Sequence, residues 1–129
     1  MNHKDVGGLA EIGFIYEAKK RGLHIMKPMT DNRKYDFIVD GGSLYKIQVK
    51  STAAKEKNRN NFKVSTSYGS HKKIKYQKED VDFIAIHLTL ADIWYIIPIE
   101  NIKYLNIRFY PHKEDCKFNK WREAWYLLQ

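Results

Sequence analysis

Apolar and polar residues alternate along residues 35–50, which is the pattern of two β-strands joined by a tight turn. Residues paired across an antiparallel hairpin share one face, so even-numbered residues must pair with even-numbered ones. A three-residue loop, 41–43, meets this condition and sets Asp36 opposite Gln48. A two-residue loop would mix the two faces. Lys50 then lies beside this pair on the polar face. The other face is predicted to be buried: Tyr35, Phe37, Val39, Tyr45, Ile47 and Val49.

The same patterning predicts the remaining elements. A helix is expected over residues 4–21, ended by Gly22, and a second, amphipathic helix over 117–128. Strands are expected at 24–28, 62–67, 82–88, 93–98 and 106–110, with a short helix at 99–104. The strands at 82–88 and 93–98 are continuously apolar, so both of their faces should be covered. These elements predict one α/β (α+β) domain, residues 1–129, with a mixed central sheet flanked by helices.

Glu11 is the one acidic residue on the inner face of the first predicted helix. At helical spacing it shares that face with Gly7, Gly8, Phe14, Ile15 and Ala18. Burying a carboxylate without a partner costs several kcal/mol, so a cation, a backbone donor or a metal ion is expected to meet Glu11.

Composition narrows the classes of function. A net charge of +8 and a pI near 9.5 favour a polyanionic partner, nucleic acid before a membrane, although an inert basic surface has the same balance. Cys116 is the single cysteine, which excludes a disulfide framework and fits a cytoplasmic location. No segment is typical of a membrane span or a signal peptide. P-loop, dinucleotide-binding, HExxH and GxSxG motifs are absent, which leaves metal-assisted hydrolysis as the supported chemistry.

The polar face of the predicted hairpin carries that chemistry, because a carboxylate, an amide oxygen and an ammonium group can serve a divalent metal and a positioned water. Asp36, a hairpin and then Gln48-Val49-Lys50 resemble the core motif of the PD-(D/E)XK nuclease superfamily, with Gln48 in the place of an acidic residue and Tyr35 in the place of proline. The resemblance extends to the helix with Glu11, to Lys27-Pro28, to the runs YKIQVKST, DVDFIAIH and WYIIP, and to the aromatic C-terminal segment. Within the superfamily, the sequence is most similar to the small group that includes the homing endonuclease of a cyanobacterial group I intron, which also has glutamine here.

This resemblance implies a restriction-endonuclease-like fold and Mg²⁺-dependent hydrolysis of double-stranded DNA to 5′-phosphate and 3′-hydroxyl ends. Asp36, the Gln48 side chain and the Val49 carbonyl would hold the metal, and Glu11 would hold a second metal or its hydration shell. Lys50 would orient the attacking water or offset charge in the transition state. Gln48 removes one negative charge, which should weaken metal binding.

The resemblance also implies a site-specific, homing-type enzyme. The same residues would suit a restriction, repair or Holliday-junction nuclease, and a basic DNA-binding module without catalysis would share the fold. Because one subunit of this size covers few base pairs, a homodimer or homotetramer is expected, with no membrane partner.

Basic and hydroxyl residues after the motif are the candidates for DNA contact. The polar stretch 53–61 is predicted to be a loop, and it fits a DNA-contacting loop or a solvated turn. A second basic stretch, 68–79, includes Tyr76, which could stack on a base, although a solvated linker has the same composition. The predicted DNA-binding residues are Ser51, Lys55, Lys57, Arg59, Lys63, Ser65, Lys72, Lys73 and Lys75.

Overall fold

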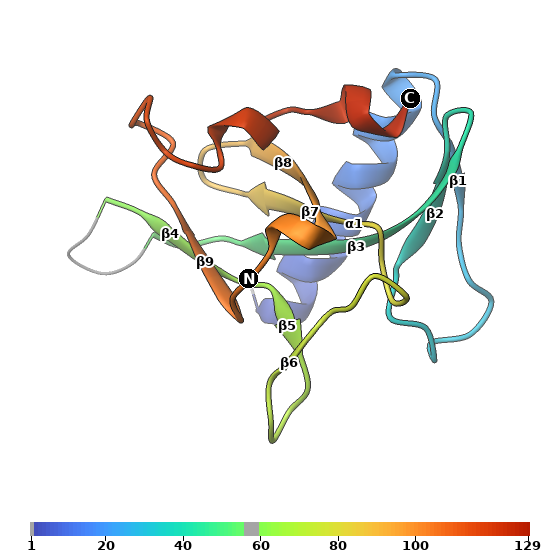
Figure 1. Cartoon of the computed structure of the whole chain (residues 1–129), viewed down its shortest axis with the longest axis horizontal. Helices are drawn as coiled ribbons and strands as arrows, with labels where there is room; N and C mark the ends of the chain where they lie inside the picture. Colours follow the sequence, from blue (N-terminus) through green and yellow to red (C-terminus); the bar gives the residue numbers. More distant parts are fainter. Residues whose placement is uncertain (1, 56–59) are drawn as a thin grey trace.

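The computed structural model describes residues 2–55 and 60–129, which form a mixed sheet of five strands with a long helix across one face (Figure 1). The strand order is β1-β2-β3-β7-β8, and neighbours are antiparallel except for β3 and β7, which are parallel. This arrangement confirms the predicted fold class. The strands are β1 (His24–Met26), β2 (Phe37–Asp40), β3 (Leu44–Thr52), β7 (Phe83–Leu88) and β8 (Ile93–Pro98).

The hairpin of β2 and β3 has the predicted register. Asp40 pairs with Leu44, so residues 41–43 form the three-residue loop. One residue before β2, the Asp36 N–H donates to the Ile47 carbonyl at 2.8 Å and extends the pairing toward Gln48. Phe37, Val39, Ile47 and Val49 are buried, as predicted for this face. The polar face is therefore free to carry chemistry.

The helix α1 (His3–Lys20) is capped by the Asn2 side chain, which accepts from the Asp5 N–H at 2.9 Å, and it gives way to Gly22 at φ +77°. Its buried residues are Ala10, Phe14 and Ala18. The Phe14 ring lies 5.5–5.9 Å from the rings of Phe37, Trp94 and Trp125. The pattern predicts Glu11 at the centre of the inner face, but in the structure Glu11 is half-buried beside this stripe. No helix among residues 2–55 and 60–129 has the length and apolar character needed to cross a membrane.

Among the described residues, the other face of the sheet is covered without an α-helix. A small antiparallel sheet of β4 (Phe62–Ser65) and β9 (Asn106–Phe109) packs there with the 3₁₀ turn η1 (Ile99–Asn101). β7 and β8 are buried on both faces, as predicted, because their alternate residues enter two separate cores. Ala85 and Ile96 pack on the α1 side, and Ile86 and Tyr95 pack on the β4–β9 side.

The strand predicted over residues 62–67 is divided at Thr66. Its N–H donates to the Leu105 carbonyl at 2.9 Å and its hydroxyl to the Tyr104 carbonyl at 2.8 Å. The chain then enters a second small hairpin, β5 (Ser67–Tyr68) and β6 (Ile74–Lys75), which projects from the body of the protein (Figure 1). The basic stretch that was expected to be a contact segment or a linker is thus an ordered hairpin.

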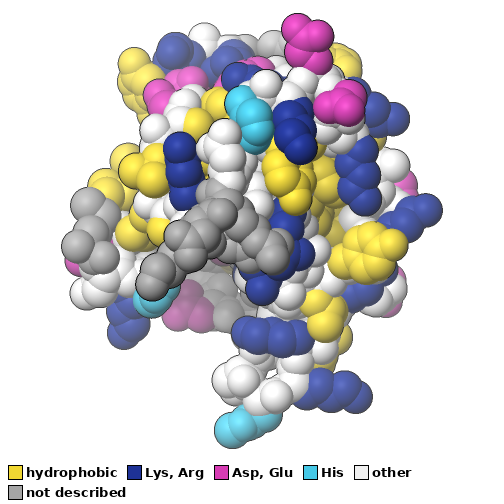
Figure 2. All heavy atoms as spheres, turned by 90° about the vertical axis from the view of Figure 1, so that its left-hand side faces the viewer, with side chains coloured by type: hydrophobic (Ala, Val, Ile, Leu, Met, Phe, Trp, Pro, Cys, Tyr) yellow, Lys and Arg dark blue, Asp and Glu magenta, His cyan; other side chains and the backbone are white. Residues whose placement is uncertain are grey.

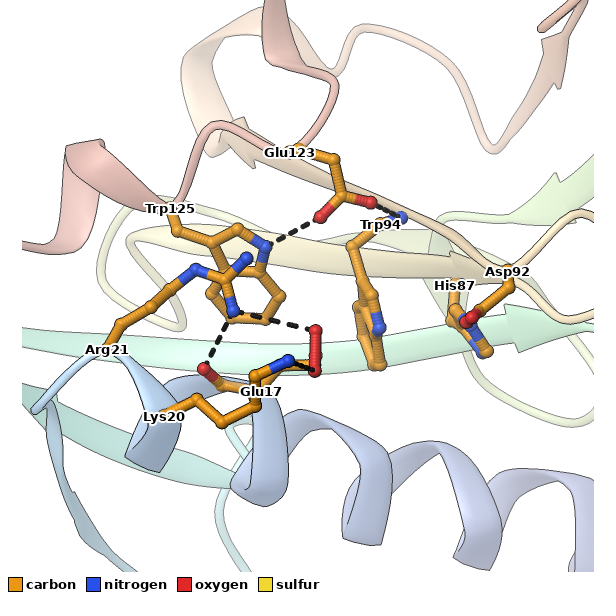
Figure 3. Close-up of polar contacts among 8 residues, drawn as sticks. All are labelled: Glu17, Lys20, Arg21, His87, Asp92, Trp94, Glu123 and Trp125. Atoms are coloured by element: carbon orange, nitrogen blue, oxygen red, sulfur yellow. Dashed lines mark hydrogen bonds and ion pairs between the residues drawn. The ribbon is translucent and has the colours of Figure 1, made fainter.

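The amphipathic helix predicted over residues 117–128 is wrong. The segment forms two 3₁₀ turns, η2 (Asn119–Trp121) and η3 (Trp125–Leu128), separated by Glu123 at φ +51°. The Glu123 N–H donates to the Trp94 carbonyl at 2.7 Å, and its carboxylate accepts from the Trp94 N–H at 2.8 Å and the Trp125 Nε1–H at 2.9 Å (Figure 3). Arg21 lies over the Trp125 ring at 4.6 Å. Contacts with β8 and α1 therefore override the helical spacing, while Ala124, Trp125 and Leu128 are still buried.

Candidate active site

Asp36 lies at the open end of the β2–β3 hairpin. Its Oδ2 accepts a hydrogen bond of 2.8 Å from the Val49 N–H, and its own N–H donates to Ile47. Two bonds to the same strand fix both the backbone and the carboxylate of Asp36. The polar face predicted from the sequence thus brings Asp36 to the part of β3 that carries Gln48 and Lys50.

The carboxyl group of Asp36 has an unusual environment. The pKa of Asp36 is raised to about 6: burial raises it most and the neighbouring charge of Glu11 adds to the increase, against the opposing effects of the Val49 N–H, Lys50 and Lys27. Glu11 and Asp36 are therefore close enough for their charges to interact, although they come from α1 and from the hairpin. Among the described residues, no cation forms an ion pair with either carboxylate within 4.0 Å. A bound cation would favour the ionised form of Asp36.

Gln48 and Val49 add neutral oxygen atoms to this pair. The Gln48 Nε2–H donates to the Val49 carbonyl at 3.3 Å, and the side chain is half-buried on the polar face of β3. Within residues 2–55 and 60–129, no three His, Cys, Asp or Glu side chains gather into a metal-binding group. The donor set is two carboxylates, an amide and a backbone carbonyl, all of them hard oxygen donors, which fits Mg²⁺.

Lys50 completes the predicted constellation. Its ammonium donates to the Ser67 carbonyl at 3.1 Å and lies 5.4 Å from the centre of the Tyr76 ring. Burial lowers its pKa, the charge of Asp36 raises it and that of Lys73 lowers it. Asp36 therefore interacts electrostatically with both Glu11 and Lys50, and Gln48 lies two residues before Lys50 on the same face of β3.

Tyr76 is the neighbour whose position the sequence did not predict. The side chain is 5% exposed, which does not fit the predicted stacking on a base. It contacts Lys50 and Tyr68, and the centres of the two tyrosine rings are 5.0 Å apart. Burial raises its pKa, and the charge of Asp36 raises it further, so the phenol stays protonated. Tyr76 lies near Lys50 because β5 and β6 pair and reverse the chain. The sequence did not predict this pairing, because a basic stretch of this kind lacks the apolar alternation typical of strands.

A cavity of about 540 Å³ opens beside Lys50, between the first turns of α1 and the end of β3. Ser51 and Lys63 both line it, so two of the predicted DNA-binding residues lie together here. Ser65 lies farther along β4, with its hydroxyl 3.3 Å from the hydroxyl of Ser67. Lys55 is exposed after β3, and the predictions for Lys57 and Arg59 lie outside the described residues.

The β5–β6 hairpin carries the other predicted DNA-binding residues. Lys72 and Lys73 are exposed near its tip and Lys75 is half-buried in β6. The Lys73 ammonium donates to the Gly69 carbonyl at 2.8 Å, which closes the tip. Figure 2 shows Lys and Arg side chains distributed over the side of the molecule that includes β4 and β9, with the hairpin projecting below it.

The sheet and its polar hairpin define an endonuclease domain. A family model described as PD-(D/E)XK endonuclease matches residues 1–128, and the chain belongs to this family. Among solved structures, it is similar to a bacterial homing endonuclease, I-Ssp6803I, with 26% sequence identity and a TM-score of 0.84 over 98% of this chain and 93% of that one. A comparison with curated proteins found no match.

Proposed function

We propose that this protein is a Mg²⁺-dependent, site-specific endonuclease of the homing type, a single domain over residues 1–129 that hydrolyses phosphodiester bonds in double-stranded DNA. The observation that carries the proposal is the Asp36 carboxylate, fixed by the Val49 N–H and electrostatically coupled to Glu11 and Lys50. The similarity to a homing endonuclease structure supports the site-specific type.

Each side chain has a distinct part in this function. Asp36, Glu11, the Gln48 amide oxygen and the Val49 carbonyl would hold Mg²⁺, and β3 supplies two of these donors from adjacent residues. When bound, Mg²⁺ supplies positive charge that polarises the phosphate and lowers the pKa of a coordinated water. Lys50 would orient the attacking water or offset the negative charge that increases in the transition state.

The exposed basic residues are proposed to hold the DNA backbone. Ser51 and Lys63 contact phosphates from the cavity wall, while Lys55, Lys72 and Lys73 contact them from exposed positions. Lys57, Arg59, Ser65 and Lys75 complete the proposed set. A homodimer or homotetramer would read a longer site by repeating this surface.

Lys50→Ala tests the proposal, because a residue that acts on the transition state affects cleavage more than binding. The variant should cleave slower by orders of magnitude, with affinity for the same duplex within several-fold of wild type when Ca²⁺ replaces Mg²⁺. Lys46→Ala is the matched control: Lys46 lies on the same strand and face, and its ammonium donates to the Glu79 carbonyl at 2.6 Å. It should cleave normally.

The substrate is identified by a cleavage selection on a randomised duplex library with Mg²⁺, followed by mapping of the cut sites. A single long site supports homing, whereas preference for a short palindrome or a branched junction reassigns the enzyme to restriction or resolution. If affinity and cleavage fall in proportion in Lys50→Ala, Lys50 binds phosphate and its assigned role is wrong. If wild type binds DNA but never cuts it, the protein is a DNA-binding module.

A further inference from the structure

The ammonium of Lys50 is held by the base of the β5–β6 hairpin. Its hydrogen bond acceptor is the carbonyl of Ser67, the first residue of β5, at 3.1 Å. The Tyr76 ring, which follows the last residue of β6, lies 5.4 Å from the same ammonium, within the range of a cation–π contact. Figure 1 shows this hairpin projecting from the body of the protein. The residues at its two ends, Ser67 and Tyr76, both contact the Lys50 ammonium.

Tyr76 is itself fixed in place. It is 5% exposed, and its ring lies 5.0 Å from that of Tyr68 across the hairpin at an interplanar angle of 53°. The Lys34 ammonium lies over the Tyr68 ring, 4.8 Å from the ring centre. Lys34 lies two residues before Asp36, so these contacts link the hairpin to the segment that leads into the site.

A lysine side chain is otherwise poorly suited to precise placement. Its four-carbon stem carries a compact charge with free rotation, and an unrestrained ammonium samples many positions. A transition-state role requires the charge to be in place before the reaction. The Ser67 carbonyl restricts the ammonium along one direction, and the face of the buried Tyr76 ring restricts it along another.

We propose that Tyr76 is a positioning residue for DNA cleavage: its ring holds the Lys50 ammonium at the site and so sets the rate of the chemical step without contributing to DNA affinity. This inference rests on the proposed nuclease function. The ring, and not the hydroxyl group, carries the role, because the ammonium lies over the ring.

The test compares Tyr76→Leu with Tyr76→Phe in single-turnover cleavage with Mg²⁺ and in binding with Ca²⁺. Tyr76→Leu should slow cleavage by about 10- to 30-fold, as expected for loss of one desolvated cation–π contact. Its DNA affinity should stay within about 3-fold of wild type, a difference smaller than any expected for a lost phosphate contact. Tyr76→Phe keeps the ring and should restore the rate. If Phe is as slow as Leu, the role assigned to the ring is wrong.

A double-mutant cycle separates positioning from a general structural effect. In a Lys50→Ala background, Tyr76→Leu should cause no further loss of rate, whereas additive losses would overturn the proposal. Should Tyr76→Leu fold poorly by circular dichroism, Tyr76→Met fills the same space with a flexible chain and repeats the test.

A spectroscopic readout separates this inference from the proposed function. In wild-type protein, NMR should show ring-current-shifted ε-methylene protons for Lys50, and Tyr76→Leu should remove that shift while Tyr76→Phe retains it. If the wild type shows the shift, Tyr76→Leu removes it and the wild type does not cleave DNA, then Tyr76 positions Lys50 and only the proposed nuclease function is wrong. An unshifted Lys50 in an active wild type would overturn the inference alone.

Discussion

Replacing Asp36 by asparagine should stabilise the metal-free protein while it abolishes cleavage. Asparagine keeps an oxygen that can accept the 2.8 Å hydrogen bond from the Val49 N–H, so the local geometry is retained. The substitution removes a partly buried charge and its repulsion from Glu11, which together raise the pKa of Asp36 from 3.8 to about 6. The carboxylate that is proposed to bind metal therefore costs stability when no metal is present.

The sign and size of this effect follow from the two pKa values. Because the pKa in the folded state is the higher one, the carboxyl group contributes stability that is fully present below about pH 3.8 and is lost as the pH rises through about 6. At about 1.36 kcal/mol per pKa unit, the loss at neutral pH is at most about 3 kcal/mol. Solvent reaches part of the group, so an effect of about 1–2 kcal/mol is expected.

Urea denaturation in EDTA measures this difference. Asp36→Asn should exceed wild type in free energy of unfolding by about 1 kcal/mol more at about pH 8 than at about pH 4.5, where part of the loss has already occurred. Adding Mg²⁺ should stabilise wild type but not the variant, because only the folded wild type is expected to bind it. Asp40→Asn, at the other end of the same strand, is the control for the chemical change. A variant no more stable than wild type at the higher pH would refute the reasoning.

Two further predictions address the hairpin turn and the basic surface. A methyl group at Gly41 would overlap the Leu128 carbonyl and the Leu23 side chain, so Gly41→Ala should lower the free energy of unfolding by about 1–3 kcal/mol in urea titrations. Gly8→Ala, in α1 with open space around it, should instead raise it by up to about 1 kcal/mol; equal effects would contradict the packing argument. The basic surface is tested by neutralising the three hairpin lysines together: Lys72→Gln, Lys73→Gln and Lys75→Gln. The slope of the logarithm of the DNA-binding constant against log salt, measured by fluorescence anisotropy, should fall by up to ~2.7, at ~0.9 per phosphate contact. The control variant carries two substitutions in α1, Lys19→Gln and Lys20→Gln. An unchanged slope in the hairpin variant, or an equal change in the control, would show that the hairpin does not contact DNA.

The sequence was sufficient to predict the motif hairpin because its determinants are local. Alternation of apolar and polar residues defines the two faces, and a loop with an odd number of residues defines the register. The structure confirms this register through the pairing of Asp40 with Leu44. The continuously apolar strands at 83–88 and 93–98 were also predictable, because burial on both faces requires that composition. The side chains that this hairpin brings together therefore followed from spacing alone, whereas their catalytic roles remain predictions.

The features that were not predicted depend on contacts between distant segments. The spacing of residues 117–128 is helical, but the bonds of Glu123 to Trp94 and Trp125 stabilise a left-handed residue in the middle of the segment. Thr66 ends β4 through bonds to residues almost forty positions away, which no local pattern encodes. Tyr76 reaches Lys50 only through such a chain reversal.

The two elements that contact Lys50, strand β3 and the β5–β6 hairpin, differ in stability. β3 is paired on both sides, with β2 and β7, whereas β5 and β6 pair over two residues each in a sheet of their own. An isolated two-stranded unit is marginally stable and opens at far lower energetic cost than a central strand. On warming, the hairpin should therefore detach from Lys50 before the sheet melts. Cleavage would then be lost at temperatures where circular dichroism still reports a folded protein, which makes this hairpin the thermal weak point of the enzyme.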